Sequence, residues 1–491
     1  MSPQTQPSVV RWQAVIGLEV HAQLLTRSKC FCSCATSFGE PANTHVCPVC
    51  LGLPGALPVL NAEALRLAVR AAIALHAQVN LRSVFARKNY FYPDLPKGYQ
   101  ISQFEHPLAS GGWLDVESFD HQGKPMVRRR AGLVRVHMEE DAGKNLHGFS
   151  GRSVVDLNRA GTPLIEIVGA PDLRSSAEAG EYLRQLRGLL MFLGVCDGNL
   201  EQGSFRCDIN VSVRPEGETT LGTRTEIKNV NSFRFAQRAI DYEIDRQVAV
   251  LSAGGRVEQE TRGWDDKNGR TVSQRSKEQA HDYRYFPEPD LPPVVLDPAW
   301  LEQQRAGLPA LPRELHARFV SQGVPAQAAD VLTSHPSIAR FFEACCALGC
   351  EPVRSANFVV SEMMRDVSTE GLEAKLPIGP GQLAGLLELV GAGTISGKQA
   401  KEVYAAIAHT DRSAADVVRE QGMAQLSDAA ALEAICARVI AGNEKNAAAY
   451  RSGKRQLLGY FVGQVMKHTR GSASPPLVNE ILERLLGKGE P

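Results

Sequence analysis

A strand pattern that ends in three acids holds the residue types best suited to chemistry in this chain. Apolar side chains alternate there with Arg135, His137 and Glu139, which is the period of a β-strand with one polar face. Glu139, Glu140 and Asp141 then follow one another directly. Adjacent carboxylates repel, so they stay ionised only beside a divalent cation or a basic partner, or when they are fully exposed. The cluster is therefore either a cation site or the solvated end of a hairpin.

Other segments repeat this alternation of apolar and polar side chains. The polar positions are Glu19, His21 and Gln23 in 16–24, Glu166 in 164–168, Arg206, Asp208, Asn210 and Arg214 in 205–214, and Glu226 and Lys228 in 224–228. Together they predict one sheet with an apolar back and a polar front. Oxygen ligands suit magnesium, and an arginine or lysine beside them suits phosphate. The front is either a metal and phosphate site or the ordinary solvated face of an antiparallel sheet.

Two cysteine pairs follow the first of these segments. Cys32 and Cys34 form a CxC pair, and Cys47 and Cys50 form a CPVC pair, with twelve residues between the two pairs. This spacing is typical of a tetrahedral site with four thiolates, so we predict these four as ligands of a structural zinc and Cys30 as a spare thiol. A redox-active CxxC pair and free buried thiols are the alternatives. Disulfides are not expected, because the eleven cysteines occur in a chain without an export signal.

Length and composition limit the class of protein. A chain of 491 residues is too long for one typical core and predicts two or three domains. It has no apolar run of about 18 residues and no signal pattern at its start, so we expect a cytoplasmic protein without a membrane span. Lys+Arg and Asp+Glu are equal at 54 each, which gives no global basic signature of nucleic-acid binding.

The pattern of elements changes at a proline cluster, residues 287–298. Before it, helices are predicted over 61–75, over 176–193 and from 234 to 246, and we expect the first of them on the apolar back of the sheet. After it, only amphipathic helical patterns remain, with a second break near 409–413. The predicted fold class is α+β: an antiparallel-sheet domain with covering helices over 1–298, an all-α helical domain over 299–410, and a small all-α tail over 411–491.

The tail is locally basic, with nine basic and four acidic residues from 438 to 491, a net charge of +5. One amphipathic helix is predicted from about 446 to 468 and includes Lys454, Arg455 and Lys467. A glycine-rich segment, 391–399, resembles a phosphate loop, but its glycine spacing is wrong and Gln399 replaces the hydroxyl that would bind magnesium. Phosphate chemistry is therefore expected on the sheet.

An aromatic, proline-rich loop occupies residues 88–103 and contains two lysines. Such a loop either stacks a base, for example a terminal adenine, or simply packs its rings in the interior. Its segment 90–96 is echoed in 285–292, which hints at a duplicated unit.

Nine blocks spread over nearly the whole chain resemble the B-subunit family of the aspartyl/glutamyl-tRNA(Asn/Gln) amidotransferases. They are GLEVH (17–21), CLGLPG (50–55) with the cysteine pairs, RKNYFYP (87–93), HMEEDAGK (137–144), PLIEI (163–167), RCDINVSVR (206–214), RTEIKN (224–229), HDYRYFP (281–287) and GQVMK (463–467). Many members of that family lack the cysteines, whereas this chain has the complete set.

The resemblance implies that the first domain is a "cradle" kinase and that the tail touches tRNA. It implies a ligase reaction on Glu-tRNA(Gln) or Asp-tRNA(Asn), in which ATP phosphorylates the side-chain carboxylate and ammonia displaces the phosphate to give Gln-tRNA(Gln) or Asn-tRNA(Asn). The implied assembly is a heterotrimer. Its other members are an amidase, which frees ammonia from glutamine, and a small third protein, which ties the two together.

We combine this implied reaction with the residue patterns to give each candidate residue an expected role. We expect magnesium on Glu19, His21, Glu140 and Glu166, with Glu139, Asp208 and Asn210 as second choices; ATP phosphates on Arg206, Arg214 and Lys228; Lys88 at the mouth of an ammonia tunnel; and tRNA on Lys454, Arg455 and Lys467. The rival hypothesis is a non-catalytic, zinc-containing tRNA-binding scaffold whose acids merely pair with its arginines. A free-standing CxxC oxidoreductase explains neither the polar sheet nor the tail.

Overall fold

The computed structural model describes residues 10–119, 125–149, 152–276, 283–423, 429–469, 473 and 475–487. The chain divides into two compact units, Met1–Glu314 and Leu315–Pro491. The first unit extends beyond the proline cluster because helix α4 (Pro298–Ala306) and the segment after it place Trp300, Leu301 and Leu308 against its core.

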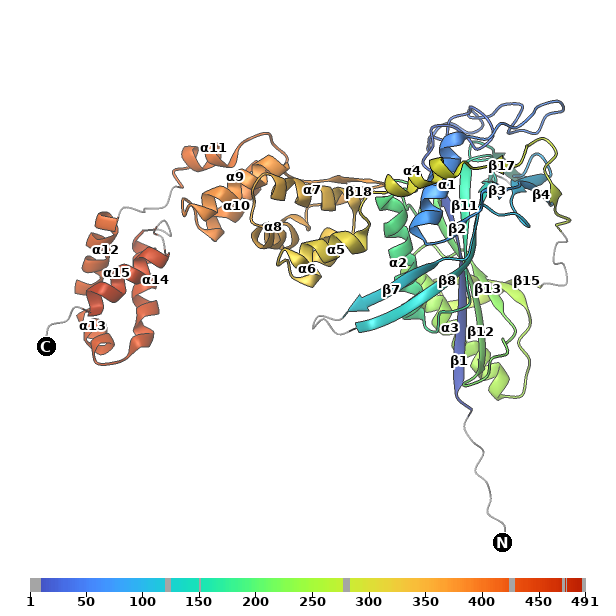
Figure 1. Ribbon diagram of the computed structural model, residues 1–491. Helices are drawn as coiled ribbons and strands as arrows, with labels where there is room; N and C mark the ends of the chain where they lie inside the picture. Colours follow the sequence, from blue (N-terminus) through green and yellow to red (C-terminus); the bar gives the residue numbers. More distant parts are fainter. Residues whose placement is uncertain are drawn as a thin grey trace, which may run out of the picture. The chain divides into compact units, whose positions relative to one another are not determined.

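A ten-stranded sheet forms the centre of the first unit (Figure 1). Its order is β15 (Arg270–Ser276), β14 (Glu260–Asp265), β13 (Thr225–Lys228), β12 (Phe205–Pro215), β1 (Trp12–Gln23), β11 (Pro163–Gly169), β8 (Pro125–Glu140), β6 (Ala109–Ser110) and β2 (Gln78–Val79), with β7 (Trp113–Phe119) paired to β8. Neighbouring strands are antiparallel except β13 and β14, which are parallel. The predicted α+β class with an antiparallel sheet is confirmed, apart from this one pair.

Three helices cover the apolar back of the sheet: α1 (Ala62–Ala74), α2 (Ser176–Phe192) and α3 (Phe233–Ser252). Alternate residues of β1, such as Ile16, Leu18 and Val20, are at most 1% exposed and pack in the same core as these helices. Asn61 caps α1 by accepting backbone hydrogen bonds from the first turn, as such a residue does at a helix start. Helix α3 continues six residues past the predicted end at Arg246.

Three smaller sheets complete the first unit. They are β16 (Phe286–Pro287) with β4 (Ala86–Asn89) and β5 (Tyr99–Ser102), β17 (Val294–Val295) with β3 (Arg82–Ser83), and β9 (Lys144–Phe149) with β10 (Arg152–Asp156). β16 pairs with Ala86 and Arg87 of β4, so the segment 285–292 runs beside the residues that precede the segment 90–96 and not beside the residues that it echoes. The described residues include no helix long and apolar enough to cross a bilayer.

The second unit is helical in the residues that the structure describes, apart from one hairpin. Its elements up to residue 423 are α5 (Pro312–Ser321), α6 (Ala326–Leu332), α7 (Pro336–Ala347), α8 (Pro352–Phe358), a π-helical turn (Val359–Met363), the hairpin β18 (Ser368–Glu370) and β19 (Glu373–Lys375), α9 (Pro380–Gly391), α10 (Gly397–Ile407) and α11 (Ala414–Glu420). Residues 392–396 form a turn before α10, whose start is capped by Ser396 and Gln399, as expected for this glycine-rich segment.

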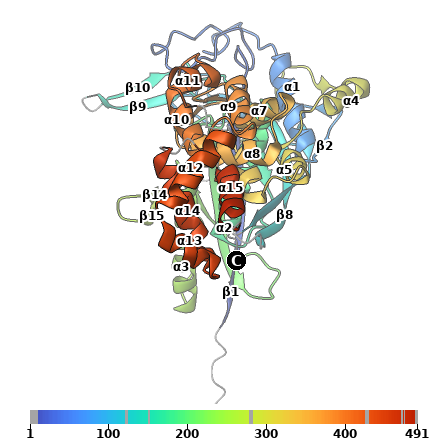
Figure 2. The same ribbon diagram turned by 90° about the vertical axis from the view of Figure 1, so that its left-hand side faces the viewer.

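The remaining helices share a core of their own. They are α12 (Ala429–Ala441), α13 (Glu444–Arg451), a short 3₁₀ turn (Arg455–Leu457), α14 (Leu458–His468) and α15 (Pro475–Gly487), which run side by side in Figure 2. Leu432, Phe461 and Leu482 are fully buried in this core. The single helix predicted over 446–468 was wrong: the chain turns at Gly453, whose φ of 111° ends α13.

Candidate functional site

Four polar side chains form a row across four neighbouring strands on the front of the sheet. Register places Arg206 of β12 opposite His21 of β1, His21 opposite Glu166 of β11, and Glu166 opposite His137 of β8. Residues directly opposite each other in a sheet point to the same face, so these side chains are neighbours. The polar front therefore exists, and its centre is at His21 and Glu166.

The row closes into a cluster with Glu139. His21 Nε2 lies 3.3 Å from a Glu166 oxygen and 3.8 Å from a Glu139 oxygen, and His137 Nε2 lies 3.4 Å and 3.8 Å from the same two side chains. Ligand atoms of His21, Glu139 and Glu166 all lie within 4.8 Å of one another. Two carboxylates and an imidazole at this spacing fit a divalent cation.

The carboxylates and histidines of the cluster keep one another charged although they are buried. Burial disfavours the charged forms, but hydrogen bonds and charges from the two histidines hold the pKa of Glu166 well below its usual range. Burial likewise opposes a charge on His137, yet Glu139 and Glu166 raise its pKa to about 9. Without a metal the cluster therefore holds two carboxylates and a protonated His137. A divalent cation would favour loss of that proton and would itself balance the charge of the two carboxylates.

Glu19 lies beside this cluster in a second polar row. It is paired in register with Asp208, and Asn210 Nδ2 donates a hydrogen bond to Glu19 Oε1 at 3.0 Å. Burial raises the pKa of Glu19, and the charges of Glu166, Asp208 and Glu226 raise it further. Lys228 Nζ contacts Asp208 at 2.6 Å and Glu226 at 3.3 Å. The second row is thus a carboxylate-rich strip with one cation.

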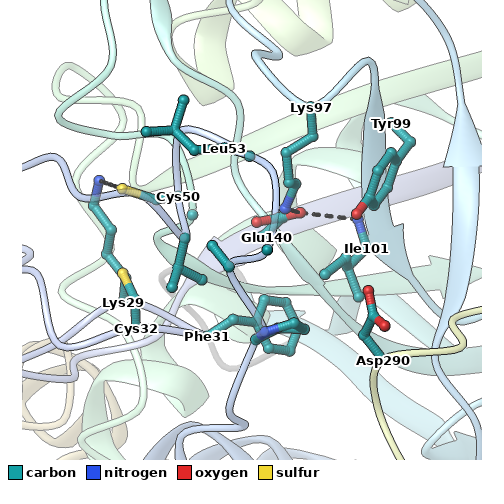
Figure 3. A pocket seen from close by; sticks show the side chains of 16 residues that line it. Lys29, Phe31, Cys32, Cys50, Leu53, Lys97, Tyr99, Ile101, Glu140 and Asp290 are labelled. Atoms are coloured by element: carbon teal, nitrogen blue, oxygen red, sulfur yellow. Dashed lines mark hydrogen bonds and ion pairs between the residues drawn. The ribbon is translucent and has the colours of Figure 1, made fainter.

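The acid triplet does not act as a unit, because its members diverge. Glu140 points away from the front, pairs with Lys97 and accepts the Ile101 backbone N–H at 2.9 Å (Figure 3). The expectation that Glu140 shares an ion with His21 and Glu166 is therefore not met. Successive strand residues face opposite sides, and Glu139 takes the front position.

Asp141, the third acid, is held by bases. Arg206 donates to its Oδ1 at 3.0 Å, Gln23 Nε2 donates to its Oδ2 at 2.7 Å, and Arg159 Nε lies 3.7 Å from Oδ2. Burial would raise the pKa of Asp141, but Arg206 and Arg159 lower it below its usual value. Asp141 therefore fixes the Arg206 guanidinium next to the row.

Arg214 is not part of the cluster. It lies on the polar parity of β12, but six residues beyond Asp208, which is about 20 Å along an extended strand. Its guanidinium donates to Gln13 Oε1 at 2.9 Å and to the Thr219 carbonyl at 2.8 Å. The expected phosphate contact from Arg214 is therefore far from the other candidates.

Lys88 lies between the aromatic segments and the cluster. Its Nζ is 4.9 Å from the ring centre of Tyr283 and 5.9 Å from that of Tyr90. Burial would lower the pKa of Lys88, yet the carboxylates of Glu139 and Glu166 raise it on balance. Part of the aromatic loop packs around this lysine, whereas Phe91 is 83% exposed, so neither interpretation of the loop covers all of its rings.

The four cysteines expected from their spacing come together. Sulfurs of Cys32, Cys34, Cys47 and Cys50 lie within 4.8 Å of one another, and Cys30 is buried outside the group. The Cys47 and Cys50 sulfurs are 3.8 Å apart. A tetrahedral ion with metal–sulfur bonds of about 2.3 Å requires nearly this separation. The group could therefore hold a metal ion.

The tail candidates are exposed. Lys454 and Arg455 lie at the turn between α13 and α14, Lys467 lies in the last turn of α14, and all three are solvent-accessible. The Arg455 guanidinium stacks 4.8 Å from the centre of the Tyr450 ring. Arg470 and Lys488, which contribute to the net charge of +5, lie outside the described residues.

The sequence-based assignment left out two residues that border the site. His137 shares the parity of Glu139 within one strand, so the alternation itself contained the signal for its position. Lys97 contacts Glu140 across 43 residues of sequence, and no local pattern pointed to that contact.

Two family models match the chain. The GatB/GatE catalytic domain matches residues 14–302, which contain both polar rows and the cysteine group, and the GatB domain matches residues 340–486.

Full-length relatives agree with these models. The chain is 55% identical to the aspartyl/glutamyl-tRNA(Asn/Gln) amidotransferase B subunit of Anaeromyxobacter sp. strain Fw109-5, over 97% of this chain and 99% of the relative. It is 49% identical to the B subunit of Thermodesulfovibrio yellowstonii and 50% identical to that of Geobacter sulfurreducens, over 97% of this chain and all of each relative. The chain belongs to the family of aspartyl/glutamyl-tRNA(Asn/Gln) amidotransferase B subunits.

Proposed function

We propose that the polar front activates and amidates the side chain of a misacylated tRNA. The substrates are Glu-tRNA(Gln) and Asp-tRNA(Asn), and the products are Gln-tRNA(Gln) and Asn-tRNA(Asn). A carboxylate is a poor electrophile, so its oxygen first attacks the γ-phosphorus of ATP and ADP leaves. Ammonia then attacks the acyl carbon and phosphate leaves. The observation that carries this proposal is the convergence of His21, Glu139 and Glu166 from three strands on one point.

Magnesium is the cation that this cluster fits best. His21, Glu139 and Glu166, whose ligand atoms lie within 4.8 Å of one another, would hold it, so Glu139 replaces Glu140 in the expected set. Bound there, the ion would neutralise charge on the ATP phosphates. Glu19 lies outside this group, in the next polar row. Asn210 would position Glu19, to which it donates a hydrogen bond, and Asp208 would hold Lys228, with which it is paired.

Phosphoryl transfer depends mainly on positioning and charge neutralisation. Arg206 supplies a guanidinium at the edge of the cluster, fixed by Asp141, and Lys228 supplies an ammonium on the other side of Glu19. These two bases are the proposed phosphate contacts. Each is now paired with an acid, so binding of ATP would exchange a carboxylate partner for a phosphate.

Lys88, whose pKa is raised by the charge of Glu139, would lie at the entrance of a polar path to the acyl carbon. Ammonia would come from glutamine through a partner amidase, with a small third protein completing the heterotrimer, since the relatives are named as one component of a multi-subunit enzyme. The tail would contact tRNA through Lys454, Arg455 and Lys467. The cysteine group would hold a structural zinc, because four thiolates leave no position open for chemistry.

The test uses the assembled amidotransferase, Glu-tRNA(Gln) and ATP labelled at the γ-phosphate. In the absence of glutamine, the wild-type enzyme should transfer label to the side-chain carboxylate, and hydroxylamine should release that label as phosphate when it forms the side-chain hydroxamate. Glu166→Gln should lose this transfer while it still binds tRNA, because it weakens the hold on magnesium. A wild-type enzyme that binds tRNA but forms no labelled intermediate, or a fully active Glu166→Gln enzyme, would support the non-catalytic scaffold instead.

A further inference from the structure

Lys29 is a fully buried lysine at the edge of the cysteine group. Its side chain is 0% exposed, and its Nζ lies 3.6 Å from the Cys50 sulfur (Figure 3). The same ammonium donates to the His45 carbonyl at 2.7 Å and to the Leu157 carbonyl at 3.3 Å. Its backbone N–H also donates to the Cys34 carbonyl at 2.9 Å. Lys29 therefore contacts both cysteine pairs and the loop after β10.

A buried ammonium needs a negative partner, since hydrogen bonds to carbonyls alone do not compensate for the loss of water. Among the described residues, no carboxylate lies within ion-pair distance of the Lys29 ammonium. Four thiolates around a divalent ion carry a net charge of −2, which is also costly to bury. The ammonium and the thiolate group lie next to each other, so each provides the opposite charge that reduces the cost of burying the other.

We propose that Lys29 is the counter-cation of the metal–thiolate group and a positioning residue for it; this rests on the metal proposed above for Cys32, Cys34, Cys47 and Cys50. The ammonium offsets one negative charge of the loaded group at Cys50. The hydrogen bonds of the ammonium to the His45 and Leu157 carbonyls hold it beside the Cys50 sulfur.

The Gly161 backbone borders the Lys29 side chain on one side. Gly161, with a φ of +88°, passes so close that a Cβ there would lie 3.3 Å from Lys29 Cδ and 3.5 Å from Cys50 Cβ. The Gly161 carbonyl accepts the Cys30 N–H at 2.8 Å, and its N–H donates to the Asp141 carbonyl at 2.9 Å. The Lys29 side chain thus lies between the cysteine group and the Gly161 backbone, which Asp141 and Cys30 hold by hydrogen bonds.

The test is a double-mutant cycle on zinc affinity in the full-length chain. Zinc is competed with a chromophoric chelator in the wild type, Lys29→Met, Cys50→His and the double variant. Lys29→Met should weaken zinc binding by about 10- to 100-fold, the range for residues that support metal ligands. Cys50→His removes one thiolate charge and keeps four ligands, so in that background Lys29→Met should cost much less.

Two controls separate charge from packing. Phe31→Leu changes the core beside Lys29, where both side chains line a cavity of about 200 Å³, and should leave zinc affinity unchanged. Lys29→Arg keeps the charge and should retain more affinity than Lys29→Met. If Lys29→Met alone does not fold, adding Cys50→His should restore a folded chain.

Each contrary result has its own meaning. Equal zinc affinity of wild type and Lys29→Met, an equal loss in both backgrounds, or a double variant that stays unfolded overturns the role of Lys29 and leaves the metal site intact. A wild-type chain that binds no zinc overturns the proposed metal site, and the role of Lys29 with it.

Discussion

His21 on β1 and Glu166 on β11 are direct cross-strand partners, and the Nε2 of one lies 3.3 Å from the Oε2 of the other. Both strands are in the interior of the sheet, with apolar residues of β1 packed in the core behind them. The separation of these two side chains is therefore set by register rather than by a loop. A metal ligand set built on register is preorganised before any ion arrives.

The divergence of Glu139 and Glu140 gives the sharpest prediction about the magnesium site. Glu139→Gln should weaken magnesium binding by at least about tenfold, since even residues that only support metal ligands account for that much. Glu140→Gln should leave magnesium affinity nearly unchanged, because this carboxylate bonds to Lys97 and the Ile101 N–H. Titration calorimetry with Mg²⁺ on both variants makes the comparison. A loss confined to Glu140→Gln would reverse our assignment.

The alternation of polar and apolar residues was enough to predict which face a side chain occupies. It placed Glu19, His21, Glu139, Glu166 and Asp208 on one front, because strand parity is a local property of the backbone. The prediction for Glu140 ignored that parity, and the contacts with Lys97 and the Ile101 N–H explain why a buried carboxylate is tolerated there.

Position along a strand, and breaks within a helix, were harder to predict. Arg214 has the right parity, but register places it far down β12, and register depends on pairing with β1. The apolar stripe on both sides of Gly453 is typical of one continuous helix, but the chain turns at this glycine. A glycine can continue a helix or adopt the positive φ that ends it, and the sequence alone does not distinguish the two. The first error concerns the position along a paired strand, and the second concerns the backbone conformation of one glycine.

The titration of His137 predicts a pH dependence of stability in the metal-free protein. Its pKa of about 9 in the folded state is raised above the usual value, so its stabilising contribution is full below about pH 6.5 and is lost as the pH rises toward 9. The loss should be on the order of 3 kcal/mol. Urea unfolding in EDTA at pH 6 and pH 9 measures it, with His137→Gln as the reference for other groups. Equal pH dependence in both proteins would contradict this prediction.

The cysteine group should stabilise the first unit only when it holds metal. Cys47→Ser leaves three thiolates and should lower both zinc content and the melting temperature of the full chain. Cys30→Ser removes a buried thiol outside the group and should keep zinc content at the wild-type level. Elemental analysis and thermal denaturation give the two readouts. Loss of zinc from the Cys30 variant with retention in the Cys47 variant would show that the ligands are assigned wrongly.

Behind the sheet, Glu243 of α3 anchors the strand that carries Lys228. Its carboxylate is fully buried and accepts Thr225 Oγ1 at 2.7 Å and Arg246 at 2.6 Å. Removing one member of a buried ionic network costs about 3–5 kcal/mol, so Glu243→Ala should destabilise the protein by that order. Asp245→Asn, at an exposed position of the same helix, should change stability by less than about 0.5 kcal/mol. Denaturant unfolding that finds similar values for both would refute the anchoring role.

The exposed bases of the tail predict a salt-dependent contribution to tRNA binding. Replacement of Lys454, Arg455 and Lys467 by alanine should reduce the slope of log affinity against log salt by about two to three, since each phosphate contact contributes close to one unit. ATP hydrolysis without tRNA should be unchanged, because the proposed phosphate contacts Arg206 and Lys228 lie in the first unit.

The matched control replaces three exposed bases of the first unit, Arg256, Lys267 and Arg305, by alanine and should keep the wild-type slope. Deletion of the chain after Met423 should reduce the slope by the same amount, because it removes α12–α15, which share one core, as a whole. Filter binding at several salt concentrations measures each slope. A tail variant that loses ATP hydrolysis and tRNA affinity equally would show that the tail acts through folding of the enzyme, since a direct phosphate contact changes only the tRNA affinity.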